Sequence, residues 1–223
     1  MWFLCPGACF DVAYSVKEIV YTLQGEGARA GRAVVLCRFT GCNLWSGREK
    51  DRRISGCWFC DTDFLEMDGE SGGKYETAGA LFSEIAGKWP KTACGEGKPY
   101  VVFTGGEPLL QLDVELIERC KTEGWETGVE TNGTIEAPPG LDWICVSPKP
   151  RSELKQRSGN EIKIVFPMGV DPSDFENLDF EHFFLQPLYD PVKTENTRRA
   201  AHYCLENPRW KLSLQIHKVI GLP

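Results

Sequence analysis

Apolar and polar positions alternate along much of the chain in short runs typical of β-strands. Alternating or β-branched segments predict strands near residues 15–22, 33–40, 100–104, 126–131, 142–147, 161–166, 182–186 and 211–216. Three other segments have apolar residues at helical spacing. The first follows Thr77 as N-cap, the second runs from Asp113 to Gly124, and the third runs from about Thr194 to before Pro208. Their expected buried faces are Leu81, Ile85 and Trp89, then Leu116, Ile117 and Cys120, then Ala200, Ala201, Cys204 and Leu205.

Strands interleaved with only three long helices predict an α/β fold with a mostly parallel sheet. Three helices are too few for a complete eightfold barrel, so we expect a partial, open barrel. Functional sites in such sheets lie at the carboxyl ends of the strands. Cys42, Gly105, Asn132 and Ser147 each follow or close a predicted strand, which predicts a site at that edge.

Composition and charge narrow the class of protein. The chain has 223 residues, of which 42% are hydrophobic, and a net charge of −7, which argues against direct nucleic-acid binding. No apolar run approaches the ~20 residues of a membrane span. Residues 1–13 contain no Lys or Arg and are broken by Pro6 and Gly7, so they are not typical of a signal peptide. We expect a cytoplasmic protein, with an extension at 1–13 and one domain at 14–223.

In a reducing compartment, ten cysteines indicate metal binding or burial rather than disulfides. Two residues separate Cys57 from Cys60, and Cys42 precedes them across a polar, basic insert of 14 residues. Three thiolates on a four-iron cluster would leave one iron open to a further ligand. A redox pair or a zinc site with another ligand is also compatible with these cysteines alone. The remaining seven cysteines are expected to be small buried hydrophobes.

The segment Thr104-Gly105-Gly106-Glu107-Pro108 follows a predicted strand. Its glycines allow a ligand to approach the backbone closely, and Glu107 can accept a hydrogen bond from an amine. Together with the three cysteines, the segment resembles the motif that binds S-adenosylmethionine (SAM) in the radical SAM superfamily. Phe59 resembles the aromatic residue that lies beside the SAM adenine in those enzymes.

Further motifs resemble one family, 7-carboxy-7-deazaguanine synthase. They are residues 21–27 (Tyr-Thr-Leu-Gln-Gly-Glu-Gly), 37–39 (Cys-Arg-Phe), 41–45 (Gly-Cys-Asn-Leu-Trp), 60–63 (Cys-Asp-Thr-Asp), 130–133 (Glu-Thr-Asn-Gly), 147–149 (Ser-Pro-Lys) and 215–218 (Gln-Ile-His-Lys). The 14-residue spacer departs from the three-residue spacing usual in the superfamily, but resembles a branch of this family. The resemblance extends from about Tyr14 to Pro223.

The resemblance implies an enzyme that converts 6-carboxy-5,6,7,8-tetrahydropterin to 7-carboxy-7-deazaguanine with loss of ammonia, in the biosynthesis of deazapurines such as queuosine. The implied cofactors are one 4Fe-4S cluster, SAM and Mg²⁺, and the implied partner is a flavodoxin-like or ferredoxin-like reductant. The implied fold is a modified, incomplete TIM-like barrel with about six core strands, assembled as a homodimer.

The resemblance also implies site residues, each at a position of this sequence that matches a motif of the family. The cluster would be held by Cys42, Cys57 and Cys60, and Mg²⁺ by Thr62. SAM would contact Phe59, Asp61, Gly106, Glu130, Asn132, Ser147, Pro148, Lys149, Gln186, Pro187, Leu188 and Tyr189. The pterin would contact Leu23, Gln24, Gly25, Glu26, Arg38, Thr104, His217 and Pro223.

Three of these residues have a chemical rationale of their own. The planar guanidinium of Arg38 suits a substrate carboxylate. Glu26 can accept from the amino-pyrimidine edge of a pterin, or can cap a turn instead. The C-terminal carboxylate of Pro223 is expected to act as a second acceptor, delivered by the last predicted strand.

Two alternative functions remain at this point. A glycyl-radical activating enzyme has the same cofactor chemistry but acts on a protein substrate. A zinc-stabilised binding module would use the same cysteines without catalysis.

Overall fold

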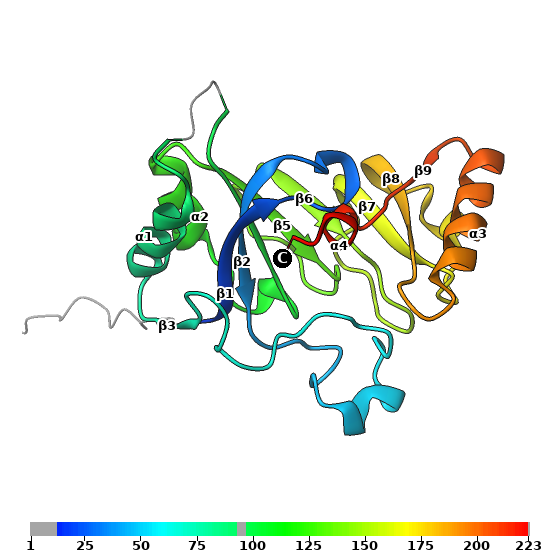
Figure 1. Cartoon of the computed structure of the whole chain (residues 1–223), viewed down its shortest axis with the longest axis horizontal. Coiled ribbons are helices and arrows are strands. Elements are labelled where there is room, and N and C mark those ends of the chain that lie inside the picture. Colours follow the sequence, from blue (N-terminus) through cyan, green and yellow to red (C-terminus); the bar gives the residue numbers. More distant parts are fainter. Residues whose placement is uncertain (1–12, 93–96, 223) are drawn as a thin grey trace, which may run out of the picture.

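The computed structural model describes residues 13–92 and 97–222. These residues form one open sheet of nine strands, in the order β3-β1-β2-β4-β5-β6-β7-β8-β9 (Figure 1). The strands are β1 (Tyr14–Leu23), β2 (Ala33–Phe39), β3 (Gly73–Tyr75), β4 (Tyr100–Gly105), β5 (Glu126–Thr131), β6 (Trp143–Val146), β7 (Ser158–Phe166), β8 (Asp179–Pro187) and β9 (Trp210–Leu212). Pairing is parallel from β2 to β9 and antiparallel for β1 with β2 and β3.

Two helices cover one end of the sheet and a third covers the other, while a short C-terminal helix lies in front of its middle (Figure 1). They are α1 (Ala78–Lys88), α2 (Val114–Thr122), α3 (Lys193–Glu206) and α4 (Ile216–Ile220), with short 3-10 turns η1 (Gly27–Arg29), η2 (Glu49–Ile54), η3 (Pro108–Leu110) and η4 (Pro172–Phe175). One apolar core lies between the sheet and α1 with α2, and a second lies under α3. The predicted incomplete barrel is confirmed, but its sheet has nine strands rather than about six.

The predicted helix starts are confirmed at Thr77 and Asp113. The Thr77 side chain accepts from the Ala80 amide, and the Asp113 side chain accepts from the Leu116 amide. The third helix contains one error, because Leu205 is 80% exposed. The face of α3 that packs on the sheet centres on Asn196 and Ala200, and a residue five positions after Ala200 points away from it at 3.6 residues per turn.

The predicted strand at 211–216 is wrong beyond Leu212, and strand β3 was not predicted. After β9 the backbone turns toward the end of β1, because the Ile216 amide donates to the Gly25 carbonyl over 2.9 Å. The apolar pattern of this segment therefore continues as α4 instead of a strand. The apolar pattern of residues 211–216 could not predict this contact, because its partner Gly25 is distant in the sequence.

The turn after β4 joins three strand ends through Glu107. Its fully buried carboxylate accepts from the Leu109 and Asn132 amides at 3.0 and 2.8 Å and from the Thr131 hydroxyl at 2.8 Å. Its own amide donates to the Gly41 carbonyl, next to Cys42. The carboxylate thus holds the strand ends in place without lining the cavity described below, and the expectation that it also meets a ligand amine stays a prediction.

Replacing Glu107 by Ala is expected to destabilise the protein strongly, because three buried donors lose their acceptor. We expect a loss of at least about 3 kcal/mol in the free energy of unfolding, measured by urea denaturation. Glu115→Ala removes an exposed carboxylate from α2 and serves as the matched control. A Glu107→Ala stability within about 1 kcal/mol of wild type would contradict this role.

Candidate active site

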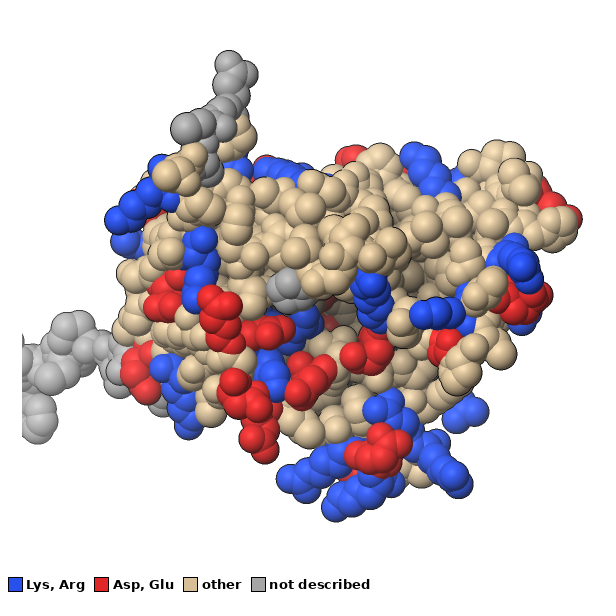
Figure 2. All heavy atoms as spheres, in the orientation of Figure 1, with Lys and Arg blue, Asp and Glu red and all other residues tan. Residues whose placement is uncertain are grey.

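The carboxyl ends of the parallel strands surround a cavity of about 490 Å³. Small-molecule sites commonly measure roughly 300–1,000 Å³, so the cavity can admit a ligand of that class. The end of β1 and the C-terminal segment close the cavity on one side, and the loop after β2 closes it on the other. Figure 2 shows acidic and basic side chains gathered around a hollow on this face.

Most residues expected at the site line this one cavity. The lining includes Leu23, Gln24, Gly25, Glu26, Arg38, Cys42, Cys57, Phe59, Cys60, Asp61, Thr62, Thr104, Gly106, Glu130, Asn132, Ser147, Lys149, Gln186, Pro187, Leu188, Tyr189 and His217. Pro148 is buried and does not line it, and Pro223 lies outside the described residues. Which ligand each residue contacts stays a prediction.

Close backbone packing positions the strand ends at the cavity. Gly105 has φ +142°, and a Cβ there would collide with the Phe39 backbone at the end of β2. A Cβ on Gly106 would likewise collide with the Gly41 carbonyl. Both positions therefore require glycine if Cys42 is to stay beside the turn after β4.

Cys42, Cys57 and Cys60 line one end of the cavity. They lie in the loop between β2 and β3, which we name the cysteine loop. Cys57 is buried with Trp45 and Phe64, and Cys42 and Cys60 pack against this group. The hydrogen bond with Cys57 lowers the pKa of the Cys60 thiol to about 6, whereas the same bond and burial raise the pKa of Cys57. Burial also raises the pKa of Cys42.

The three thiols suit a cluster in which each thiolate binds its own iron atom. In the part of the chain that the structure describes, no three His, Cys, Asp or Glu side chains lie close enough together to hold one metal ion. A four-iron cluster makes a different demand, since each thiolate binds a different iron atom. Three thiols spaced around the end of one cavity, one of them with a lowered pKa, meet that demand.

The other cysteines follow the sequence expectation where they are described. Cys37, Cys120 and Cys145 are buried free thiols, and Cys204 is half-buried. Burial raises the pKa of each of them, which keeps the thiols protonated and unreactive. The remaining three, Cys5, Cys9 and Cys94, lie outside the described residues.

A buried ion network forms the opposite wall. The Lys163 ammonium on β7 contacts Glu26 at 2.5 Å and Glu130 at 3.2 Å. Glu26 also accepts from the side-chain amides of Gln186 and Gln215 at 3.0 and 2.9 Å. The Glu26 carboxylate does not cap the turn that follows it, so the capping alternative is wrong.

The network fixes the charges of its members. Burial alone would raise the pKa of Glu26, but the charge and hydrogen bond of Lys163 and the bond from Gln215 lower it to about 2. Burial alone would lower the pKa of Lys163, but Cys145, Glu130 and Glu26 around it raise it well above its usual value. At neutral pH the carboxylates of Glu26 and Glu130 raise the pKa of Lys163, because burial keeps Cys145 protonated and uncharged. The pair is therefore ionised at neutral pH.

Lys163 was not among the predicted site residues, although charged residues within an apolar strand indicate it. Glu161 and Lys163 interrupt an otherwise apolar strand at alternate positions, next to Ile162 and Ile164. Both charged residues are at most 3% exposed. Charged residues that alternate with apolar ones normally indicate a solvent-facing side, but both faces of this parallel strand are covered.

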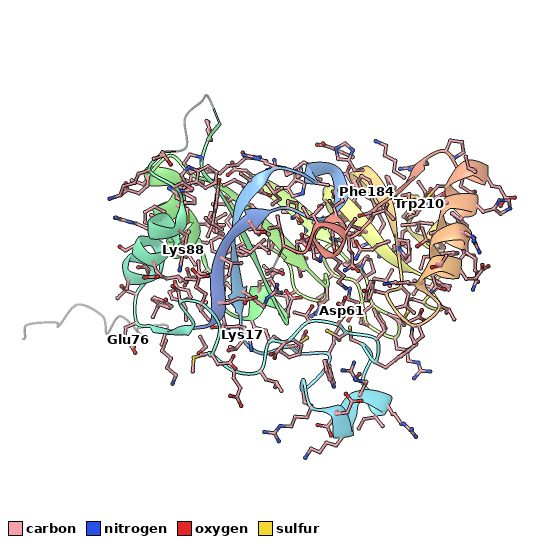
Figure 3. The ribbon with its side chains drawn as sticks, in the orientation of Figure 1. Lys17, Asp61, Glu76, Lys88, Phe184 and Trp210 are labelled. Carbon is pink, nitrogen blue, oxygen red and sulfur yellow. The ribbon has the colours of Figure 1, made fainter. Side chains whose placement is uncertain are left out.

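Two ion pairs involve cavity residues of β1 and β2 and the loop after the cysteines. Arg38 Nε donates to Glu18 at 2.8 Å, and Lys17 contacts Asp63 and Asp68 at 2.6 Å each. Lys17 is buried, and its contacts with Asp63 and Asp68 attach the loop to β1. Figure 3 labels Lys17 on β1 and Asp61 in the loop. Lys17, Glu18 and Asp63 line the cavity without having been predicted.

The C-terminal helix lies across the rim of the cavity. Lys218 pairs with Asp61 at 2.6 Å and lies 3.9 Å from the centre of the Tyr189 ring. The His217 ring packs so closely on Gly25 that any side chain there would collide with it. Helix α4 therefore joins the cysteine loop to the end of β1.

The described helices include none with the length and apolar character needed to cross a bilayer. No protein-family model matches the chain. In structure, the chain resembles the molecule described as "Crystal structure of QueE from Escherichia coli", with a TM-score of 0.65 and 24% identity, over 92% of this chain and 95% of that one. The two therefore share a fold.

Comparison of sequences gives closer relatives. The 7-carboxy-7-deazaguanine synthase of Bradyrhizobium diazoefficiens is 58% identical over 212 residues, which cover 95% of this chain and 100% of that protein. The protein of the same name from Bordetella pertussis is 54% identical over 213 residues, with the same coverage. A third, from Burkholderia multivorans, is 50% identical over 213 residues. The chain belongs to the 7-carboxy-7-deazaguanine synthase family.

Proposed function

We propose that this protein converts 6-carboxy-5,6,7,8-tetrahydropterin to 7-carboxy-7-deazaguanine, with loss of ammonia, and so supplies a precursor of queuosine and related deazapurines. The observation that carries the proposal is one cavity with three thiols at one end and a buried carboxylate network at the other. The family relationship supports the same reaction. It does not favour a glycyl-radical activating enzyme or a zinc-stabilised binding module.

At the thiol end, Cys42, Cys57 and Cys60 would hold a 4Fe-4S cluster. When bound, the cluster supplies the electron that cleaves SAM and generates the radical for the reaction. Phe59, Asp61 and Lys149 line the adjoining part of the cavity, and Lys149 donates to the Ser147 hydroxyl at 2.6 Å. These side chains would position SAM next to the cluster.

Around the SAM pocket, fixed hydrogen bonds hold the remaining polar groups. The side-chain amide of Asn132 donates to the Asn43 side chain at 3.0 Å and accepts from the Thr134 backbone amide. These two bonds fix the orientation of the Asn132 side chain. Gln186, on β8, is held by its bond to Glu26. Such preorganisation lowers the entropic cost of binding.

At the other end, Arg38 would bind the substrate carboxylate. Its Nε is engaged by Glu18, so the neighbouring Nη groups can point to a ligand while the side chain stays in place. Glu26 and Gln24 present ordered polar groups to the ring of the pterin. The C-terminal carboxylate as a further acceptor stays a prediction, as do the homodimer and the cytoplasmic location.

We further propose that Mg²⁺ binds through Thr62, which lines the cavity between Asp61 and Asp63. One hydroxyl is a weak ligand, but Mg²⁺ normally keeps several waters and takes oxygen ligands from its substrate. A flavodoxin-like or ferredoxin-like protein would provide the electron.

The direct test is an anaerobic reaction of the reconstituted protein with SAM, dithionite and the carboxytetrahydropterin. We expect mass spectrometry to detect 7-carboxy-7-deazaguanine and released ammonia. A protein with full iron content that cleaves SAM but leaves the pterin unchanged would refute the proposed substrate.

Replacing Cys42, Cys57 or Cys60 by Ala is expected to remove most of the bound iron and the broad absorbance near ~400 nm. The reason is that each thiolate would hold one iron of a single cluster. Iron content is measured after anaerobic reconstitution, with Cys204→Ala as the matched control. Another cysteine that proves as necessary as these three would overturn the three-ligand model.

Arg38→Lys keeps the positive charge but loses the planar fork. Loss of a charge-assisted hydrogen bond costs about 1.5–3 kcal/mol, so substrate affinity should fall roughly 10- to 150-fold. Titration calorimetry with SAM present measures the affinity, and Arg48→Lys on the exposed insert is the control. An affinity within about twofold of wild type would reject the role of Arg38.

Thr62→Ala is expected to keep the cluster and SAM cleavage but to respond less to added Mg²⁺. Mg²⁺ would act on the substrate as a Lewis acid and a template, which requires its protein ligand. Turnover is measured over a range of MgCl₂ concentrations. A variant whose rate rises with Mg²⁺ as much as that of the wild type would exclude Thr62.

A further inference from the structure

The insert between Cys42 and Cys57 forms a positively charged surface on an acidic protein. Residues 48–53 contain four basic and two acidic side chains, whereas the whole chain has a net charge of −7. Figure 2 shows this concentration of Lys and Arg over the projecting turn η2. We name the exposed residues Arg48, Lys50, Arg53, Ile54 and Trp58 the basic insert surface.

The two acidic residues of the turn are engaged within it. Glu49 pairs with Arg52 at 2.6 Å, and Asp51 accepts from the Ser46 hydroxyl at 2.6 Å. Within the described residues, Arg48, Lys50 and Arg53 form no ion pair with an acidic side chain. Their charges are therefore directed to solvent.

The backbone that carries the basic insert surface is anchored by neighbouring side chains. Arg52 donates to the carbonyls of Trp58 and Cys60 at 3.0 Å each, and its guanidinium stacks 4.2 Å from the centre of the Trp45 ring. Trp45 is 7% exposed, and its indole donates to the Arg48 carbonyl. An anchored backbone of this kind loses less entropy on binding a partner than a flexible loop would.

The surface also contains exposed apolar groups next to the proposed cluster ligands. Trp58, between Cys57 and Cys60 in the sequence, is 51% exposed, and Ile54 is 86% exposed. The Trp58 ring packs edge-on against Phe59, which lines the cavity. The insert thus presents the outer side of the cysteine loop, while SAM and substrate would occupy the inner side.

We propose that the basic insert surface is the docking site for a small acidic one-electron carrier protein of the flavodoxin or ferredoxin class. This inference rests on the proposed function, because it assigns the insert to reduction of the cluster held by the adjacent cysteines. In the transfer, the reduced carrier loses one electron and the cluster gains it, and no bond is formed or broken. The electron would enter through the outer side of the loop, beside Trp58.

Charge and size favour such a partner. Opposite charges steer diffusional encounter and raise the association rate, and this effect weakens with salt. Electron-transfer complexes are usually small and transient, with less than about 1,200 Å² buried, so one projecting turn with an exposed Trp and Ile is sufficient. Trp is also enriched among the residues that dominate binding energy.

The test compares the wild type with Arg48→Glu/Lys50→Glu/Arg53→Glu. Its matched control, Lys91→Glu/Lys98→Glu/Arg198→Glu, makes the same change in charge at exposed positions outside the insert. Arg52 is left intact because it supports the loop. Purified flavodoxin and ferredoxin are the probes, and binding is measured by biolayer interferometry at low and high salt.

We expect the insert variant to bind the carrier at least tenfold more weakly at low salt, with a smaller difference at high salt. Oxidation of the reduced carrier, followed by its absorbance, should slow to the same degree. Iron content and dithionite-driven turnover should equal those of the wild type, and the control variant should bind normally.

Unchanged carrier binding by the insert variant, or equal weakening in the control variant, would overturn the docking site. Failure of the wild type to bind either carrier, or binding of RNA in place of the carriers, would overturn it as well. Failure of the proposed function gives a different result, since dithionite-driven product would then be missing from the wild type itself.

Discussion

The buried ammonium group of Lys163 ties together the elements that surround the cavity. It joins β7 to the segment after β1 through Glu26 and to β5 through Glu130. Glu26 extends the network to β8 and to the C-terminal segment through two glutamines. Removing a charge from water is costly, so this cation is tolerated only because both carboxylates and their hydrogen bonds are in place.

This constraint has a consequence for acid stability. The folded protein holds the pKa of Glu26 at about 2, below its ordinary value of 4.5, so the folded state binds the proton more weakly than the unfolded chain. The resulting stabilisation is present above pH 4.5 and is lost as the pH falls from about 4.5 toward about 2. At neutral pH the network is fully charged and keeps this wall of the cavity ordered.

The two ends of the cavity are built by different means. At the polar end, charges and amides from distant elements converge on Glu26. At the thiol end, close backbone packing at Gly105 and Gly106 and the buried Glu107 carboxylate fix the strand ends. Lys17 and Lys218 attach the cysteine loop to β1 and α4.

Much of this arrangement could be predicted from the sequence, because local rules decide it. The caps at Thr77 and Asp113 use local hydrogen bonds, and the carboxyl ends of parallel strands must share one edge. Most residues of the predicted motifs therefore lie around one cavity. The failures involve distant partners: Lys163 interrupts an apolar pattern, and the segment after Leu212 turns away to meet Gly25.

The most direct test of the account is a double-mutant cycle of Glu26→Gln and Lys163→Met, with the free energy of unfolding measured at pH 7. If the ion pair organises the cavity, each single variant should lose about 3–5 kcal/mol, because a buried charge is left unpaired. The double variant should lose less than the sum of the two, with a coupling energy above about 1 kcal/mol. Losses that add within about 0.5 kcal/mol would contradict the central role of this pair.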